Sequence, residues 1–351
     1  MTSPSQLGIL VCGAGVFGRN HLRVWRALEN DGQGVRLAAV VEPDPARAAA
    51  AGREWNVTVY PSVQAALATR AAGETAFAAA SVCTPTSAHF HVAEALLESG
   101  VDTLVEKPIA ASVSEAGRLI GCATQKGRIL QTGHLERFNP AVAAAETILN
   151  HPMFFEAHRL SVFSPRSLDV DVVLDLMVHD LDIVLNFVRS PVRSLHAVGL
   201  PILSRKVDIA NVRIEFASGC VANFTASRVS TERVRKLRFF QPHQYVSIDY
   251  ARQDLLVIDV SHAAAADPAV MAAAAAAGSE GLPGLHIEKP PVHPGEPLRL
   301  EIEAFLSAVR TRSAPRVSGE DGRAALALAL EINAAIAAHA RRAGLDRLTQ
   351  A

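Results

Sequence analysis

The strongest constraint on the fold is a glycine-rich turn placed directly after an apolar run. Residues Leu7–Cys12 have the composition of a buried strand, and a helical pattern starts at the end of the turn. Glycines in the pattern G-x-G-x-x-G permit a tight turn and let backbone N–H groups approach a pyrophosphate at the helix N-terminus. The order strand, turn, helix therefore predicts a dinucleotide site whose contacts come from Gly13, Gly15, Val16, Phe17 and Gly18.

The first 134 residues alternate strand-like and helix-like segments. The expected strands are residues 7–12, 36–41, 77–83, 102–105 and 129–132, and the expected helices are residues 19–29, 45–54, 62–71, 88–99 and 112–125. Repeated units of this size specify a doubly wound parallel sheet. Residues 1–134 are therefore expected to form a Rossmann domain of an α/β protein.

From residue 135 the rhythm changes to closely spaced strands. A helix at 140–150, a strand at 154–163 and an apolar helix at 172–188 precede strand-like runs at 192–200, 207–216, 220–228, 234–240, 245–250 and 255–260. Ala217-Ser218-Gly219 is a plausible hairpin turn between two of these runs. Residues 135–351 are expected to form an α+β domain with a large, open, mostly antiparallel sheet.

The end of the chain is expected to be a long loop followed by two helices. Residues 261–297 are rich in Ala, Pro and Gly, which favours a loop or flap. The helical patterns that follow cover residues 298–312 and 319–342, and Ser318 is a candidate N-cap for the second.

Composition excludes several classes of protein. Hydrophobic residues make up 49% and charged residues 20%, as in a soluble globular protein. The formal net charge is −1, so there is no basic surplus for binding nucleic acid. No signal peptide and no apolar run of the ~20 residues that span a membrane are recognised, which predicts a cytoplasmic protein. The four cysteines lack pair spacing and are expected to be reduced core thiols.

An acidic residue at the end of the second strand bears on the choice of cofactor. Glu42 lies 24 residues after Gly18, where a carboxylate can bind the ribose 2′-OH and repel the extra phosphate of NADP. We therefore expect NAD and not NADP. Two alternatives stay open: Glu42 could simply cap the helix after Pro43, and Asp44 could compete for the ribose.

Two further turns follow strands at the carboxyl edge of the predicted parallel sheet, where ligands of such sheets bind. Thr84-Pro85 could contact the nicotinamide half of the cofactor, or could be a turn without a further role. In Glu106-Lys107-Pro108, the proline favours an extended backbone at Lys107. A lysine there can lower the pKa of a substrate hydroxyl and help to move its proton.

The same tripeptide occurs again as Glu288-Lys289-Pro290 in the late loop. Nothing around it resembles the end of a sheet strand, so no chemistry is expected there.

The apolar helix at 172–188 carries a polar constellation. Asp175 and His179 are four residues apart and are expected to share a helix face with Asp182. His179 is then a candidate general base, with Asp175 setting its tautomer. The alternatives are a polar helix face packed between domains and a metal-binding stripe. Because only one histidine contributes, no metal is predicted.

These motifs together resemble those of the Gfo/Idh/MocA oxidoreductase family over essentially the whole chain. The shared features are the glycine turn followed by His21, Thr84-Pro85, Glu106-Lys107-Pro108 and Asp175-x-x-x-His179-x-x-Asp182. The resemblance implies a Rossmann domain in which Thr84, Pro85 and Glu106 line the cofactor, and a C-terminal domain with a large open sheet. It also implies that Lys107, Asp175 and His179 are catalytic. One departure is Met177, where the family often has glycine.

Within that family, residues 133–140 and 169–182 look like those of the UDP-N-acetylglucosamine 3-dehydrogenases. Such enzymes make a 3-keto nucleotide sugar, which an aminotransferase converts to a 3-amino sugar for lipid A or surface polysaccharide. A diphosphate needs cations, and Arg137 and Arg166 are the first candidates. Asn139 and Asp182 are candidate substrate contacts. Arg228, Arg233 and Arg235 are weaker candidates for the diphosphate, and any single arginine could instead be a surface charge.

Two other functions remain open from the sequence. One is a sugar or cyclitol dehydrogenase of the inositol or glucose type, and the other is an NAD-binding regulatory protein without turnover. An open sheet commonly buries its free face against another subunit, so a homodimer or homotetramer through the C-terminal sheet is expected.

Overall fold

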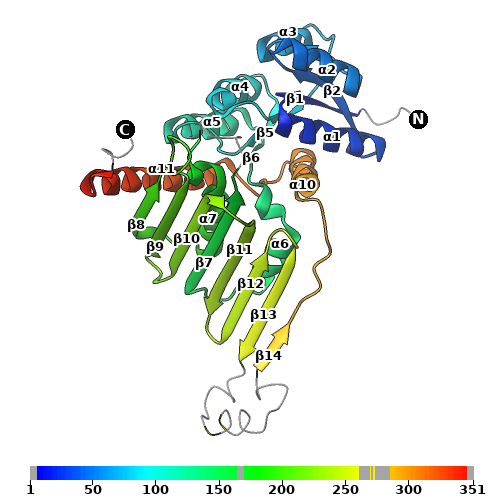
Figure 1. The fold of residues 1–351 in the computed structure, drawn as a ribbon. Helices are drawn as coiled ribbons and strands as arrows, with labels where there is room; N and C mark the ends of the chain where they lie inside the picture. Colours follow the sequence, from blue (N-terminus) through cyan, green and yellow to red (C-terminus); the bar gives the residue numbers. More distant parts are fainter. Residues whose placement is uncertain (1–5, 164–169, 261–268, 270–271, 273–284, 346–351) are drawn as a thin grey trace. The chain divides into compact units, whose positions relative to one another are not determined.

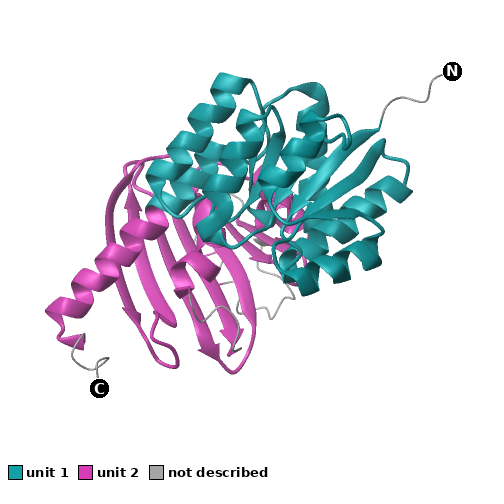
Figure 2. Cartoon of the chain, turned by 90° about the horizontal axis from the view of Figure 1, so that it is seen from above, with its two compact units in different colours: residues 1–135, 296–327 teal, residues 136–295, 328–351 magenta. Residues whose placement is uncertain are grey.

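The computed structural model describes residues 6–163, 170–260, 269, 272 and 285–345 (Figure 1). The chain divides into two compact units, coloured separately in Figure 2: unit 1 is residues 1–135 and 296–327, and unit 2 is residues 136–295 and 328–351. The sequence-based division assigns residues 296–327 to the second domain, whereas the structure packs them in unit 1. The reason is that Leu298, Ile302 and Phe305 join the hydrophobic core of unit 1.

Unit 1 is built on a parallel sheet with the strand order β3-β2-β1-β4-β5-β6. Its strands are β1 (Leu7–Cys12), β2 (Val35–Val41), β3 (Thr58–Tyr60), β4 (Ala79–Val82), β5 (Asp102–Glu106) and β6 (Leu130–Gly133). Most of their residues are buried, as expected for strands covered on both faces. The predicted doubly wound parallel sheet is thus confirmed, and β3 is a short strand that the sequence pattern did not predict. Ligands of such sheets bind where the order reverses, here between β1 and β4.

Polar side chains start three of the helices in unit 1. The helices are α1 (Val16–Asn30), α2 (Pro45–Trp55), α3 (Val63–Ala71), α4 (Thr86–Glu98), α5 (Val113–Lys126) and α10 (Pro297–Thr311). Asp44, Ser62 and Ser112 each accept a hydrogen bond from the backbone N–H three residues further on. These N-caps satisfy donors that the helix leaves without a partner.

Unit 2 contains an eight-stranded sheet with the order β14-β13-β12-β11-β7-β10-β9-β8. Its strands are β7 (Phe154–Val162), β8 (Val192–Leu200), β9 (Ile209–Phe216), β10 (Val221–Ser230), β11 (Val234–Gln241), β12 (Gln244–Asp249), β13 (Asp254–Val260) and β14 (Leu285–Glu288). Only the β7–β10 pairing is parallel among the described strands of this sheet. This confirms the large, mostly antiparallel sheet. The predicted hairpin turn also joins β9 to β10, with Gly219 at φ +89°.

Strand β14 corrects an expectation about the segment 261–297, which is predicted as a loop throughout. Leu285–Glu288 pairs antiparallel with β13, so Glu288 does end a strand. The prediction that Glu288-Lys289-Pro290 follows no sheet strand is therefore wrong. A strand of four residues among prolines is too short to give a recognisable period. The strand is nevertheless the edge of an antiparallel sheet and not part of a parallel one. Most of the remaining segment lies outside the described residues.

The helices of unit 2 contact one face of its sheet. They are the 3-10 helix η1 (Leu135–Phe138), α6 (Pro140–Thr147), η2 (Val173–Met177), α7 (Val178–Val188) and α11 (Gly319–Arg342), of which η1 and α11 begin in unit 1. Burial alternates along β7, β9 and β10, as expected for strands with one covered face. The core contains the rings of Phe155, Phe187 and Phe239, whose centroids lie 5.5 to 6.4 Å apart.

The helix predicted at 172–188 is not a single α-helix. It starts as the π-helix η2 and continues as α7. The Asp171 side chain accepts hydrogen bonds from Val173 and Leu174, each at 3.0 Å, and so holds the start of η2. Asp175 lies within the wider π turn and His179 follows it in α7, so the argument that four residues place them on one α-helical face does not apply. Single π turns are frequent at functional sites.

Helix α11 starts with a capping box. Ser318 Oγ accepts from the Asp321 N–H at 3.1 Å, and Asp321 Oδ2 accepts from the Ser318 N–H at 2.8 Å, which confirms the predicted N-cap. By length and composition alone this helix could also cross a membrane, which is weak evidence because core helices of soluble proteins pass the same test. Its residues Leu326, Ile332 and Ile336 are buried.

All four cysteines are free thiols, as predicted, but only Cys12 and Cys220 are buried, whereas Cys83 and Cys122 are half-buried. Burial raises the pKa of Cys12 to about 12 and the pKa of Cys220 to about 11. Both thiols are therefore protonated near neutral pH and poor nucleophiles.

Candidate cofactor and catalytic site

The three glycines of the turn after β1 are needed for different reasons. Gly13 has φ +96°, and a Cβ there would lie 2.7 Å from the carbonyl oxygen of Cys83 at the end of β4. A Cβ on Gly18 would lie 1.9 Å from the carbonyl oxygen of Gly13. Gly15, the N-cap of α1, would meet no described atom within 4 Å. The fold therefore requires Gly13 and Gly18, while Gly15 leaves space for a ligand to approach the backbone.

The helix that follows the turn begins with two exposed apolar side chains. Val16 is 72% exposed and Phe17 is 38% exposed. Both are predicted cofactor contacts, and their exposure at the N-terminus of α1 leaves them available for one.

Glu42 is held under the glycine turn. Its side chain is 3% exposed, Oε2 accepts from the Ala14 N–H at 2.9 Å, and Oε1 accepts from the Asp44 N–H and from Arg47 Nη2, each at 3.0 Å. Burial alone would raise the pKa of Glu42, but these hydrogen bonds and the Arg47 charge lower it overall. The N-cap of α2 is Asp44, so helix capping is not the role of Glu42.

His89 connects the two other turns at the carboxyl edge of the sheet. From α4, its Nε2 lies 2.8 Å from the Thr84 carbonyl oxygen and its Nδ1 lies 2.8 Å from the Pro108 carbonyl oxygen. Burial lowers the pKa of His89, while the two carbonyls and the Glu106 carboxylate act in the opposite direction. His89 thus positions Thr84 and the turn that carries the half-buried Lys107, whose peptide bond to Pro108 is cis. The sequence analysis missed His89, although its place three residues inside a helix after Thr84-Pro85 was a usable signal.

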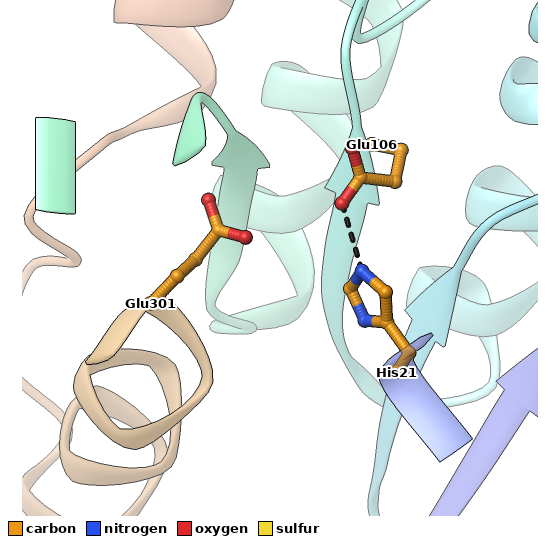
Figure 3. Close-up of side chains that lie close together, drawn as sticks. All are labelled: His21, Glu106 and Glu301. Carbon is orange, nitrogen blue, oxygen red and sulfur yellow. Dashed lines mark hydrogen bonds and ion pairs between the residues drawn. The ribbon is translucent and has the colours of Figure 1, made fainter. Parts of the chain in front are cut away.

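Glu106 is held by a second histidine (Figure 3). His21 Nε2 on α1 lies 2.9 Å from Glu106 Oε1 at the end of β5, and both side chains are buried. Glu301 on α10 completes a group whose ligand atoms all lie within 4.8 Å of one another. One atom from each residue is fewer than the four ligands of a structural zinc site. The role that the contacts support is to fix the Glu106 carboxylate beside Lys107.

Unit 2 contains a buried ionic network beside His179. Arg159 on β7 donates to both oxygens of Asp180, at 2.8 and 3.0 Å, and to Glu136 Oε1 at 2.9 Å. Its guanidinium also lies 4.9 Å from the centre of the Tyr250 ring. Burial would lower the pKa of Arg159, but the two carboxylates raise it well above its usual value. The network attaches the first turn of α7 to the sheet.

The sequence analysis missed this network. Asp180 follows the predicted base directly, in an otherwise apolar helix, and a charge in such a place is usually buried only with a partner. The partner could not be identified, because Arg159 lies on a different element.

The predicted substrate residues Arg137 and Asp182 lie together. Arg137 Nη1 is 3.4 Å from Asp182 Oδ1, and both side chains are almost completely buried. Asn139 is the N-cap of α6: its Oδ1 accepts from the Ala141 N–H, and its Nδ2 donates to Glu136 and to the Tyr250 carbonyl. All three therefore have partners inside unit 2. Arg166 lies outside the described residues.

Asp175 lies near another candidate cation. Its Oδ2 is 4.0 Å from Arg228 Nη2, which donates to the Val170 carbonyl at 2.6 Å. Arg228 Nε is also 3.8 Å from Asp208 Oδ1. The Asp175 carboxylate and the Arg228 guanidinium are far apart in sequence, yet they lie close together within unit 2. His179 is half-buried.

The class of the protein follows from unit 1. A parallel sheet in the order 3-2-1-4-5-6, with a glycine turn after β1 and an acidic residue after β2, defines a dinucleotide-binding Rossmann domain. Residues 7–134 match the model of an oxidoreductase family with an NAD-binding Rossmann fold, and residues 147–241 match the Gfo/Idh/MocA C-terminal domain. The chain belongs to the Gfo/Idh/MocA oxidoreductase family and is an NAD-binding oxidoreductase.

Individual relatives agree with this assignment. The chain is 34% identical to the UDP-N-acetylglucosamine 3-dehydrogenase of Acidithiobacillus ferrooxidans, over 95% of this chain and 98% of that protein. The solved structure of that enzyme is similar, with a TM-score of 0.83 over 95% of this chain and 98% of the other. A scyllo-inositol 2-dehydrogenase of Bacillus subtilis is 26% identical over 64% of this chain and 68% of its own length. An oxidoreductase from Agrobacterium radiobacter, solved with NAD+, L-tartaric acid and magnesium, shares the fold at 16% identity, with a TM-score of 0.78 over 95% of this chain and 96% of that one.

The two glycines Gly15 and Gly18 give a matched test of the cofactor site. Gly15→Ala should leave the melting temperature nearly unchanged but weaken NAD+ binding, because its Cβ meets no protein atom and occupies the ligand's approach. Gly18→Ala should lower the melting temperature as well, since its Cβ overlaps the Gly13 carbonyl. Calorimetric titration and thermal unfolding measure both effects. Unchanged NAD+ affinity in Gly15→Ala would contradict this site.

The Arg159 network is expected to be costly to break. Arg159→Met should destabilise unit 2 by about 3–5 kcal/mol, because Asp180 and Glu136 stay buried without their cation. The control is Arg238→Met, whose guanidinium is 3.8 Å from Glu156 on the more exposed face and should cost about 0–1 kcal/mol. Urea unfolding followed by circular dichroism measures the difference, and equal losses would contradict the buried network.

Proposed function

We propose that the protein oxidises the C3 hydroxyl of a UDP-N-acetylhexosamine, with UDP-N-acetylglucosamine as the leading substrate, and reduces NAD+. The observation that carries the proposal is the 34% identity to a UDP-N-acetylglucosamine 3-dehydrogenase over 95% of the chain. The retained Lys107, Asp175 and His179 support it, since a family member that only bound NAD would not need groups for proton transfer.

Bound NAD+ would supply the hydride acceptor for the C3–H bond, and in the proposed reaction His179 accepts the proton of the C3 hydroxyl. The products are the 3-keto sugar, NADH and a protonated imidazole. Lys107 donates a hydrogen bond to the hydroxyl oxygen and so lowers the pKa of that hydroxyl. Asp175 favours the imidazolium that forms.

The contacts within unit 2 change which residues we favour as contacts of the diphosphate. Arg137 is paired with Asp182, so we propose that these two residues form a rigid part of the sugar pocket. The Arg228 guanidinium lies near Asp175. Arg228 is therefore a stronger candidate for binding the diphosphate than the sequence analysis made it. Arg166 and Asn139 stay proposed contacts, with Asn139 acting by fixing the start of α6.

The wider setting is part of the same proposal. A 3-keto nucleotide sugar is the substrate that an aminotransferase needs to make a 3-amino sugar, for lipid A or for a surface polysaccharide. We place the reaction in the cytoplasm and propose a homodimer or homotetramer that buries the half-exposed face of the unit 2 sheet.

A second candidate is oxidation of a free sugar or cyclitol. The similarity to a scyllo-inositol 2-dehydrogenase favours it, although at lower identity and over less of the chain.

The two candidates are separated by a substrate panel. Purified protein with NAD+ should form NADH with UDP-N-acetylglucosamine when a partner aminotransferase and glutamate remove the ketone, and mass spectrometry should detect the 3-amino product. Turnover of free myo-inositol, scyllo-inositol or glucose, with no reaction of the nucleotide sugar, would replace the proposal by the second candidate. NAD+ binding without turnover of any of these substrates would favour the regulatory function.

The two Glu-Lys-Pro tripeptides supply a matched test of the catalytic lysine. Lys107→Met should lower kcat about 10²–10⁴-fold, with little change in NAD+ affinity, because the hydrogen bond that lowers the pKa of the substrate hydroxyl is lost. Lys289→Met, in an exposed residue after β14, should leave kcat unchanged. A Lys107→Met protein with full activity would remove Lys107 from the mechanism.

A further inference from the structure

A small cavity of about 190 Å³ lies between the glycine turn with the start of α1 and one side of α2. It is lined by Ala14, Gly15, Val16, Arg19, Arg47, Ala50, Ala51, Glu54 and Trp55. One lining residue, Arg47, pairs with Glu42 directly after β2. The end of β2 is the part of a Rossmann domain that receives the adenosine ribose. The charges of the side chains at that position decide whether the protein binds or repels a 2′-phosphate on the ribose.

Glu42, the acidic residue expected to repel that phosphate, is buried and its charge is compensated by Arg47. The Glu42 side chain is 3% exposed, while Arg47, which pairs with it at 3.0 Å, is 55% exposed. Two backbone N–H groups, of Ala14 and Asp44, also donate to the carboxylate. The ion pair is therefore oriented with its negative end inward and its positive end outward.

The exposed end of this pair can still bind an anion. A guanidinium has five N–H donors, and among the described contacts Arg47 uses one of them, to Glu42. Arg19, on the same cavity, is 56% exposed and bonds through Nη2 to both carboxylate oxygens of Glu54, at 2.8 and 2.9 Å. Arginine is well suited to phosphate because its planar donors match the phosphate oxygens.

We propose that Arg47 is the specificity-determining residue at the adenosine ribose and that it accepts a 2′-phosphate. The protein then binds NADP+ with an affinity of the same order as that for NAD+, and the carboxylate of Glu42 does not exclude it. NAD+ remains a cofactor, since the same guanidinium can donate to a ribose hydroxyl. The inference rests on the dinucleotide-binding unit and is independent of the proposed sugar substrate.

The test uses two ligands that differ only in the 2′-phosphate, adenosine 2′,5′-bisphosphate and 5′-AMP, titrated calorimetrically into the full chain. The wild-type dissociation constants should agree within about tenfold, and NADP+ and NAD+ should behave alike. Arg47→Ala should weaken bisphosphate binding by about tenfold or more and change 5′-AMP binding by less than about threefold, because one charge-assisted contact is lost. Arg47→Lys should retain part of the bisphosphate affinity.

The control is Arg53→Ala, which removes the same charge from an exposed position on the same helix and should change neither ligand. Thermal unfolding of Arg47→Ala checks that loss of the Glu42 partner leaves the unit folded. Two results would overturn the proposal: a wild-type protein that binds the bisphosphate more than about a hundredfold more weakly than 5′-AMP, or an Arg47→Ala protein that loses both ligands equally. The second result would assign Arg47 to the support of Glu42 alone. Neither result bears on turnover of the nucleotide sugar.

Discussion

Unit 1 depends on a backbone approach that side chains would prevent. The turn after β1 packs against the end of β4 because Gly13 has no Cβ to meet the Cys83 carbonyl, and α1 packs on the turn because Gly18 has none to meet Gly13. This approach lies at the point where the strand order reverses. The carboxyl ends of neighbouring strands are thereby left at one edge, where their turns carry Thr84 and Lys107.

Histidines from the surrounding helices then fix what that edge presents. His89 contacts the carbonyls of Thr84 and Pro108, and His21 contacts the Glu106 carboxylate. Each histidine can affect the site without contacting a reactant, because each holds a turn that carries a proposed functional group. The residues around Lys107 are therefore positioned by helices that are distant in sequence, which explains why a short tripeptide cannot by itself identify a catalytic lysine. The second Glu-Lys-Pro tripeptide also follows a strand, but at the edge of an antiparallel sheet.

In unit 2, charged side chains are buried within an apolar helix. Asp180 and Asp182 are each 2% exposed, and arginines from other elements, Arg159 and Arg137, lie against them. A buried pair contributes little net stability, but removing one partner is costly. Such pairs hold α7, which carries His179, in one orientation on the sheet, and the π turn that contains Asp175 sets the angle between Asp175 and His179.

The sequence by itself determined the features that depend on neighbours along the chain. Strand and helix periods, the glycine turn and the Ser318 cap are local, so the parallel sheet, the mostly antiparallel sheet and the family could be predicted. Only the tertiary structure decided which distant groups meet. It placed Arg47 outside a buried Glu42, paired Arg137 with Asp182, and put α10 into the core of unit 1. The physical reason is that a period reports which face of an element is buried, whereas a charge or hydrogen-bond partner is chosen by the packing of elements that the chain brings together from far apart.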